Sequence, residues 1–342
     1  LGYTHCFYVS GGNVMHLLDS ASRKFTCIPF IHEVGAGIAG DYFNEVADAT
    51  HKSFVLVSAG PALTNLTTAI ASAWTDSREL LIIAGQSKST EIGKGNYRQI
   101  GFQEIDGISI CRGITKSSYR IDEIKSASEV ISQIEKTWLP RKGPVYLEFC
   151  LDVSQFVVNE RNSKFKFPKK KIKKSQKTNF SELNKNVRKA LELIINSERP
   201  LILLGGGVHR RVATQYFKKM ELTNLPIATT FNGADRITGS IKNYAGRPNW
   251  YGSRWANLIV QQSDLVIAIG TRLGLLQVGY NWQEFAPLAR IMQIDLDQNE
   301  LNKGFPKVHF KVQADADIFL PKLFDELSKI PFKYGNANWE SL

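Results

Sequence analysis

Three short clusters of residues could do chemistry, and the first centres on one carboxylate. Glu33 follows His32 at the end of the apolar run IPFI, and the small-residue segment VGAGIAG comes after it. The run is typical of a buried strand, and burying a charged carboxylate is costly unless something binds it. We therefore interpret Glu33 as a cofactor-binding residue. Zinc is not predicted, because H-E-x-x-H needs a second His where this chain has Ala36.

The second cluster is SAGPALTN, residues 58–65, which follows another apolar run. Gly60 and Pro61 predict a rigid turn, and Thr64 or Asn65 is expected to open the next helix. In open parallel sheets, ligands bind outside the carboxyl ends of the strands, so this turn is well placed for a site. The same residues also suit an ordinary strand-to-helix connection.

The third cluster is GFQEID, residues 101–106, which follows a segment containing several glycines. It predicts a loop that holds Phe102, Gln103 and Glu104. On its own this loop indicates no particular chemistry.

Short apolar runs alternate with helical segments along the chain and must position these clusters. Runs without polar alternation indicate strands covered by helices on both faces, as in parallel sheets. The sequence therefore predicts an α/β chain with two doubly wound parallel-sheet domains. The expected strands are CFYVS at 6–10, FVLVS at 54–58, LLIIAG at 80–85, PVYLEF at 144–149, LILLG at 201–205, PIATT at 226–230, LVIAIG at 265–270 and IMQIDL at 291–296.

The net charge of +11 is concentrated in one stretch, RNSKFKFPKKKIKKSQK at 161–177. This stretch holds nine basic residues and no acidic one, so the rest of the chain is nearly neutral. A nucleic-acid-binding surface spreads its charge over a folded face, so we interpret the stretch as a linker and expect no nucleic-acid partner. Salt-sensitive anion binding through this run is the alternative.

The linker separates two α/β domains. The second is expected to begin with the helix FSELNKNVRKALELIINSE, with Ser181 as its N-cap. The predicted organisation is an N-terminal domain over 1–155, a basic linker over 156–179, a central α/β domain over 180–330 and a tail over 331–342 that leads to a further domain.

Composition favours a cytoplasmic protein. Hydrophobic residues make up 43% and charged residues 22%, as in ordinary globular proteins. No apolar run approaches the roughly 20 residues that cross a membrane. The four cysteines form no C-x-x-C pair and are interpreted as reduced thiols. The chain begins with Leu and opens almost directly into a strand, with no signal peptide, so we interpret it as a trimmed piece of a longer chain.

In this order and spacing, the three clusters resemble the pyrimidine-binding domain of thiamine diphosphate enzymes, and among them the acetolactate synthase group. That group carries H-E-x-x-A, G-P-x-x-T-N and G-x-Q-E, which HEVGA, GPALTN and GFQE match. SGGNVMHLLDS at 10–20 and RKGPVYLEFCLDV at 141–153 also resemble this domain. FNGADRITGS, GRPNWYGSRWANLIVQQSDLVIAIGTRLG and EFAPLARIMQIDLD resemble the group's central, Rossmann-like domain. The resemblance covers nearly the whole chain.

The resemblance implies roles for individual residues. Glu33 is expected to hydrogen-bond the aminopyrimidine ring of thiamine diphosphate and to promote its imino tautomer, because a carboxyl group kept out of water tends to hold its proton. Gln103 is the second expected catalytic residue and faces the substrate. The implied cofactor-binding residues are Gly11, Gly12, Glu33, Pro61, Asn65, Phe102 and Arg141, the last matching a position that contacts FAD.

The implied reaction has two halves. A 2-oxo acid, such as pyruvate, is decarboxylated, and the acyl-anion equivalent is transferred to a second carbonyl. A homodimer or homotetramer is expected, because in the family the cofactor bridges two subunits. The G-D-G motif for Mg²⁺ is absent, and the one GD pair, Gly40-Asp41, lies inside the first domain's expected helix. The magnesium ligands are thus expected in a third domain, so this chain alone is predicted to be catalytically incomplete.

Two departures leave alternatives open. Leu151 stands in CLDV where the group has Lys, so the acceptor could instead be a sugar nucleotide, as in relatives that build polysaccharides. LLGGGVHRR at 203–211 follows a strand but lacks the G-x-G-x-x-G spacing, so FAD binding is left open. The rival functions are a nicotinamide-dependent oxidoreductase, which requires that spacing, and a non-catalytic subunit that keeps the fold.

Overall fold

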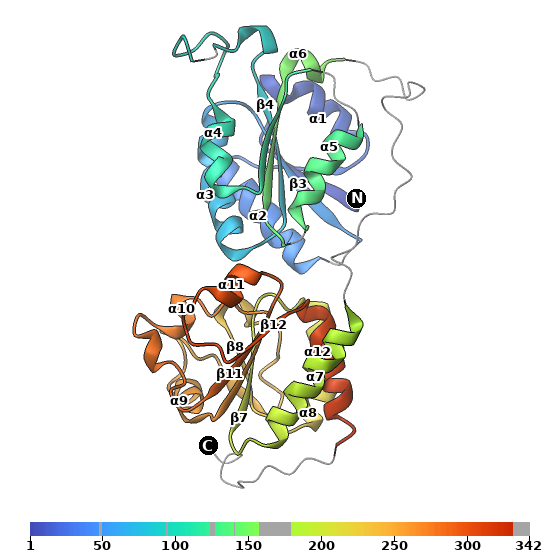
Figure 1. Ribbon diagram of the computed structural model, residues 1–342. Helices are drawn as coiled ribbons and strands as arrows, with labels where there is room; N and C mark the ends of the chain where they lie inside the picture. The colour runs from blue at the N-terminus through green and yellow to red at the C-terminus, as the bar shows by residue number, and fades with distance from the viewer. Residues whose placement is uncertain (48–49, 94, 124–126, 140, 157–178, 331–342) are drawn as a thin grey trace. The chain divides into compact units, whose positions relative to one another are not determined.

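The computed structural model describes residues 1–47, 50–93, 95–123, 127–139, 141–156 and 179–330 (Figure 1). The chain divides into two compact units, Leu1–Ser175 and Gln176–Leu342, and each is described by itself. The predicted tail over 331–342 and all of the predicted linker from 157 to 178 lie outside the described residues. The boundaries predicted there remain predictions.

The first unit is built on a sheet of six parallel strands in the order β2-β1-β3-β4-β6-β5. The chain starts at β1 and places β2 on one side and the later strands on the other, so the sheet is doubly wound. The strands are β1 Tyr3–Tyr8, β2 Thr26–Pro29, β3 Lys52–Val57, β4 Leu80–Gln86, β5 Ser117–Ile121 and β6 Pro144–Cys150.

Helices cover both faces of this first sheet (Figure 1). Side chains of α2, α3 and α4 bury one face, and those of α1 and α5 bury the other. The central strands are apolar on both sides for this reason, as the uninterrupted runs predict. The helices are α1 Met15–Ser22, α2 Glu33–Val46, α3 Pro61–Asp76, α4 Gly107–Cys111, α5 Ala127–Ile134 and the short α6 Leu151–Ser154.

The second unit repeats this plan with six parallel strands in the order β12-β11-β10-β7-β8-β9. Helices α7, α8 and α12 pack on one face of its sheet, and α9 and α10 pack on the other. The strands are β7 Pro200–Leu204, β8 Ile227–Thr229, β9 Tyr244–Gly246, β10 Leu265–Ile269, β11 Arg290–Asp295 and β12 Phe310–Gln313. The helices are α7 Phe180–Ile195, α8 Arg210–Leu222, α9 Arg254–Gln262, α10 Leu275–Val278, α11 Gln298–Asn302 and α12 Ala316–Leu327.

Two doubly wound parallel sheets confirm the predicted fold class. Three local predictions are wrong. The run before Glu33 is not a buried strand, because β2 lies at the sheet edge with three of its four residues exposed. Helix α3 starts at Pro61 with Gly60 as its N-cap, rather than at Thr64 or Asn65, since Pro suits a first helical position whose N–H needs no partner. Asn179, not Ser181, caps α7.

No helix in the described part of the chain combines the length and the apolarity that a membrane crossing needs.

Candidate functional site

The three sequence clusters meet at one edge of the first sheet. Glu33 follows the carboxyl end of β2, Pro61 follows β3, and the loop with Gln103 lies beyond the end of β4. Because the strands are parallel, all of these segments lie at the same edge. The predicted grouping of the clusters follows from this topology.

Glu33 and Asn65 are in direct contact across α2 and α3. The Asn65 Nδ2 donates to Glu33 Oε2 at 2.9 Å. Glu33 is the first residue of α2, where the partial positive charge of the helix N-terminus favours a carboxylate. His32 caps this helix, with its Nδ1 accepting from the Val34 amide at 3.2 Å. Glu33 is partly exposed rather than buried as predicted, because the strand before it is an edge strand.

Gly11 and Gly12 differ in what they do. A Cβ on Gly11 would lie 2.5 Å from the Ser58 Cβ, so only glycine lets the turn after β1 pack against the end of β3. A Cβ on Gly12 would meet nothing within 4 Å. This contact lies between β1 and β3, where the strand order reverses and open α/β sheets bind ligands.

The loop with Phe102 and Gln103 sits directly on the turn that starts α3. Gly60 and Gln103 both have a positive φ, of +62° and +58°, which is uncommon for a residue with a side chain such as Gln103. A Cβ on Gly60 would lie 2.6 Å from the Gln103 carbonyl oxygen, so the two backbones are in contact there. Phe102 is 75% exposed beside them.

Three polar side chains that were not predicted as site residues bind the backbone carbonyls of this loop. Ser87 Oγ and Asn13 Nδ2 donate to the Phe102 carbonyl oxygen at 3.0 and 3.4 Å. Gln86 Nε2 donates to the Ile105 carbonyl oxygen at 2.9 Å. The available signal was the polar pair Gln86-Ser87 at the carboxyl end of the apolar strand β4, at the edge where sites form.

Leu151 reaches the same edge from β6, as the first residue of α6. Next to it, Asp152 accepts from the Ser89 amide at 2.9 Å and from Ser89 Oγ at 2.6 Å. Burial raises the pKa of Asp152, but these hydrogen bonds outweigh it and leave that pKa below its usual value. Leu151 itself is partly buried and offers an apolar surface.

Arg141 is not part of this grouping. It precedes β6 and so lies at the amino-terminal edge of the sheet, opposite to Glu33 and Gln103. Its Nε and one terminal nitrogen donate to Ser77 Oγ at 3.0 and 2.7 Å.

In the second unit, the glycine-rich loop after β7 is hydrogen-bonded to backbone carbonyls, mostly at the end of β10. The amides of Gly205 and Gly207 donate to the carbonyls of Ile269 and Gly270 at 2.9 and 2.8 Å, and that of Val208 donates back to Gly205. These three amides are thus not presented to a phosphate.

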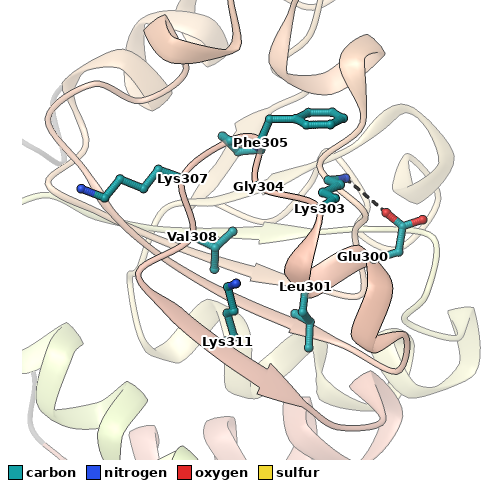
Figure 2. Close-up of a pocket in the computed structure, with 9 residues that line it drawn as sticks. Glu300, Leu301, Lys303, Gly304, Phe305, Lys307, Val308 and Lys311 are labelled. Carbon is teal, nitrogen blue, oxygen red and sulfur yellow. Dashed lines mark hydrogen bonds and ion pairs between the residues drawn. The ribbon is translucent and has the colours of Figure 1, made fainter.

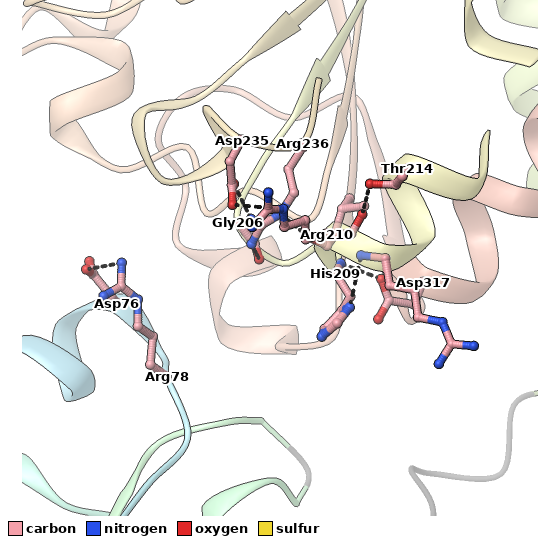
Figure 3. A network of polar contacts seen from close by, with 11 residues as sticks. Asp76, Arg78, Gly206, His209, Arg210, Thr214, Asp235, Arg236 and Asp317 are labelled. Carbon is pink, nitrogen blue, oxygen red and sulfur yellow. Dashed lines mark hydrogen bonds and ion pairs between the residues drawn. The ribbon is translucent and has the colours of Figure 1, made fainter. Parts of the chain in front are cut away.

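A buried arginine completes this network (Figure 3). Arg236, 2% exposed, donates to the carbonyl oxygens of Gly206 and Val208 and pairs with Asp235. The His209 amide at the start of α8 donates to Asp317 at 2.6 Å.

A pocket of about 170 Å³ lies elsewhere in the second unit, between α11 and β12 (Figure 2). Lys303, Lys307 and Lys311 contribute to its lining, and Lys303 pairs with Glu300 at 3.2 Å. It contains none of the residues predicted to form a site.

Family comparisons agree with this arrangement of two α/β units. Residues 1–110 match the model for the N-terminal TPP binding domain of thiamine pyrophosphate enzymes, and residues 187–323 match the model for their central domain. The chain belongs to the thiamine pyrophosphate enzyme family. Thiamine pyrophosphate is another name for thiamine diphosphate, so the predicted resemblance to thiamine diphosphate enzymes is confirmed.

Similar proteins of this family are acetolactate synthase subunits. The probable acetolactate synthase large subunit of Methanococcus aeolicus is 30% identical over 90% of this chain and 50% of its own length. The isozyme 1 large subunit of Escherichia coli is 30% identical over 98% of this chain and 56% of its own. The probable acetolactate synthase large subunit of Methanocaldococcus jannaschii is 32% identical over 88% of this chain and 50% of its own length. The chain thus spans about half the length of these curated relatives.

Proposed function

We propose that this chain supplies the pyrimidine-binding and central domains of a thiamine diphosphate-dependent enzyme similar to acetolactate synthase. The enzyme decarboxylates a 2-oxo acid and joins the remaining acyl unit to a second carbonyl. The observation that carries the proposal is the Glu33–Asn65 hydrogen bond at the carboxyl edge of the sheet, beside the left-handed Gln103.

The residues at this edge fit the pyrimidine half of the cofactor. An aminopyrimidine needs both a hydrogen-bond acceptor and a donor, which a carboxylate and an amide provide. When bound, the cofactor supplies the carbon nucleophile and the electron sink.

This chain's residues hold and orient that half. Glu33 shares a proton with a ring nitrogen, and the bond from Asn65 fixes the plane of its carboxyl group. Pro61 and the glycines Gly11 and Gly12 shape the wall of the site, and Gly11 keeps β1 and β3 close together. Phe102 and Gln103 face the reacting substrate, with Phe102 giving an apolar surface and Gln103 an amide.

Mg²⁺ and FAD, which the resemblance also implies, have less support in the residues of this chain. The described residues bring together no group of three or more His, Cys, Asp or Glu side chains that could hold a metal, so no step is assigned to Mg²⁺. The glycine-rich loop of the second unit commits three amides to backbone carbonyls, two of them at the end of β10, and these amides do not fit a flavin diphosphate, so FAD has no role in the proposal. We further propose a cytoplasmic homodimer or homotetramer, on the resemblance alone.

The test uses the full-length protein from the native gene. Purified protein freed of cofactor should release CO₂ from a 2-oxo acid such as pyruvate only after thiamine diphosphate and Mg²⁺ are added. The carboligation product identifies the acceptor. Failure to bind thiamine diphosphate in calorimetry would refute the proposal and favour a non-catalytic subunit.

A further inference from the structure

Glu104 ties together the segment that carries Gln103. Its Oε1 accepts from the Gly93 amide at 2.7 Å, and its Oε2 accepts from the amides of Ile100 and Gly101 at 2.8 and 3.1 Å. Burial raises the pKa of Glu104, but the three backbone donors outweigh it and leave the pKa below its usual value. The carboxylate is therefore charged at neutral pH and joins Gly93 to Ile100 and Gly101 through its two oxygens.

Gln103, the residue before Glu104, has a backbone that needs such support. A φ of +58° is uncommon for a residue with a side chain and persists only where the surroundings enforce it. The Gln103 carbonyl faces Gly60, whose missing side chain makes room for it. Gly60 in turn is the N-cap of α3, the helix that carries Asn65.

The two ends of the turn are held by different means. On the sheet side, a Cβ on Gly101 would lie 2.3 Å from Ser87 Oγ, so the turn is pressed onto the end of β4. On the solvent side, the bonds of Glu104 to Gly93 and Ile100 hold the segment. Removal of the Glu104 carboxylate would leave Gln103 held from one side.

We propose that Glu104 is a positioning residue of the candidate site, which holds Gln103 left-handed and so places its amide against the substrate. This inference rests on the proposed function, because the role of Gln103 in turnover comes from it. Without Glu104, Gln103 relaxes towards the right-handed conformation, and we expect kcat to fall by about 5- to 30-fold.

Glu104→Gln is the informative variant. It keeps the shape of the side chain but sets an amide donor against one of the backbone donors, so at least one bond is lost. The matched control is Glu91→Gln in the same part of the chain. The Glu91 carboxylate is exposed and pairs with Lys88 at 3.3 Å, so its loss should leave turnover unchanged.

A double-mutant cycle on the full-length enzyme separates positioning from a general loss of stability. If Glu104 acts through Gln103, Glu104→Gln lowers kcat in the wild type but lowers it no further in a Gln103→Gly background. Equal losses in both backgrounds would show a purely structural role and overturn the inference.

Hydrogen exchange of the amides of Ile100 and Gly101 provides a readout that needs no cofactor. Glu104→Gln should speed exchange at both amides, whereas unchanged rates would overturn the positioning role. Full turnover in Gln103→Gly alone would instead overturn the role of Gln103, and absence of turnover by the wild type with thiamine diphosphate and Mg²⁺ would overturn the proposed function. The two failures are thus distinguishable.

Discussion

Replacing Arg78 with Met is expected to destabilise helix α2 by about 3–5 kcal/mol at neutral pH, the usual cost of leaving one buried charge without its partner. Arg78 donates to Asp41 Oδ2 at 3.0 Å, and the two side chains are 13% and 3% exposed. Arg78 also pairs with Asp76 at 3.3 Å (Figure 3). Asp41 lies on α2, the helix that begins with Glu33, so loss of the pair would weaken the helix that positions Glu33.

The expected loss of stability in Arg78→Met depends on pH, and the direction of this dependence follows from the pKa of Asp41. Burial raises the pKa of Asp41, while Arg78 opposes this rise. The pKa of Asp41 in the folded state lies above its unfolded value of about 3.9. The contribution of Asp41 to folding stability is therefore fully present below the unfolded pKa and is lost as the pH rises through the folded pKa. Without Arg78 the folded pKa rises further. The deficit of Arg78→Met should therefore be larger at pH 7.5 than at pH 5.

Native-state hydrogen exchange of the α2 amides measures this local free energy. The matched control is Arg23→Met, which breaks the exposed Arg23–Asp19 pair and should cost less than about 1 kcal/mol. Adding Asp41→Asn to Arg78→Met should restore part of the loss. A deficit as small as that of the control, or one equal at both pH values, would refute the reasoning.

Three further outcomes are expected. Gly11→Ala should destabilise the first unit by about 1–3 kcal/mol, since the new methyl overlaps Ser58, and a thermal melt unchanged from wild type would contradict this. Leu151→Lys in the full-length enzyme should increase condensation of pyruvate with itself if the apolar side chain limits the acceptor, and an unchanged product ratio would argue against that role. Glu104 and Asp152 have lowered pKa values, so their stabilising contribution is present above the unfolded pKa and is lost as the pH falls through the folded pKa. Replacing both carboxylates, by Glu104→Gln and Asp152→Asn, should make the melting temperature depend less on pH between about pH 3 and pH 6, the range in which carboxylates titrate.

The central strands were predictable and the edge strands were not. Strands such as β4 and β10 are buried on both faces, so their sequences are apolar runs that stand out. Strand β5, SSYRI, and strand β12, FKVQ, are short, partly exposed and mixed in polarity. Their pairing is decided by the neighbouring strand rather than by their own pattern.

The grouping of the site was predictable because motifs after parallel strands must share one edge. The local geometry was not. The partial exposure of Glu33 follows from β2 being an edge strand. The positive φ of Gln103 depends on Gly60, which is distant in the sequence, and on the hydrogen bonds of Glu104 to Gly93 and Ile100. Arg141 was assigned to FAD by resemblance alone, and its position before β6 puts it at the edge of the sheet opposite to Glu33.

The central claim is that Glu33 tunes bound thiamine diphosphate. The most direct measurement compares CO₂ release from pyruvate by the full-length wild type and by Glu33→Gln, with cofactor binding measured on both and Glu45→Gln on the same helix as the control. We expect turnover to fall by about 10²- to 10⁴-fold in Glu33→Gln, the usual effect of removing a proton-transfer group, while the control stays active. Wild-type turnover in Glu33→Gln would contradict the claim.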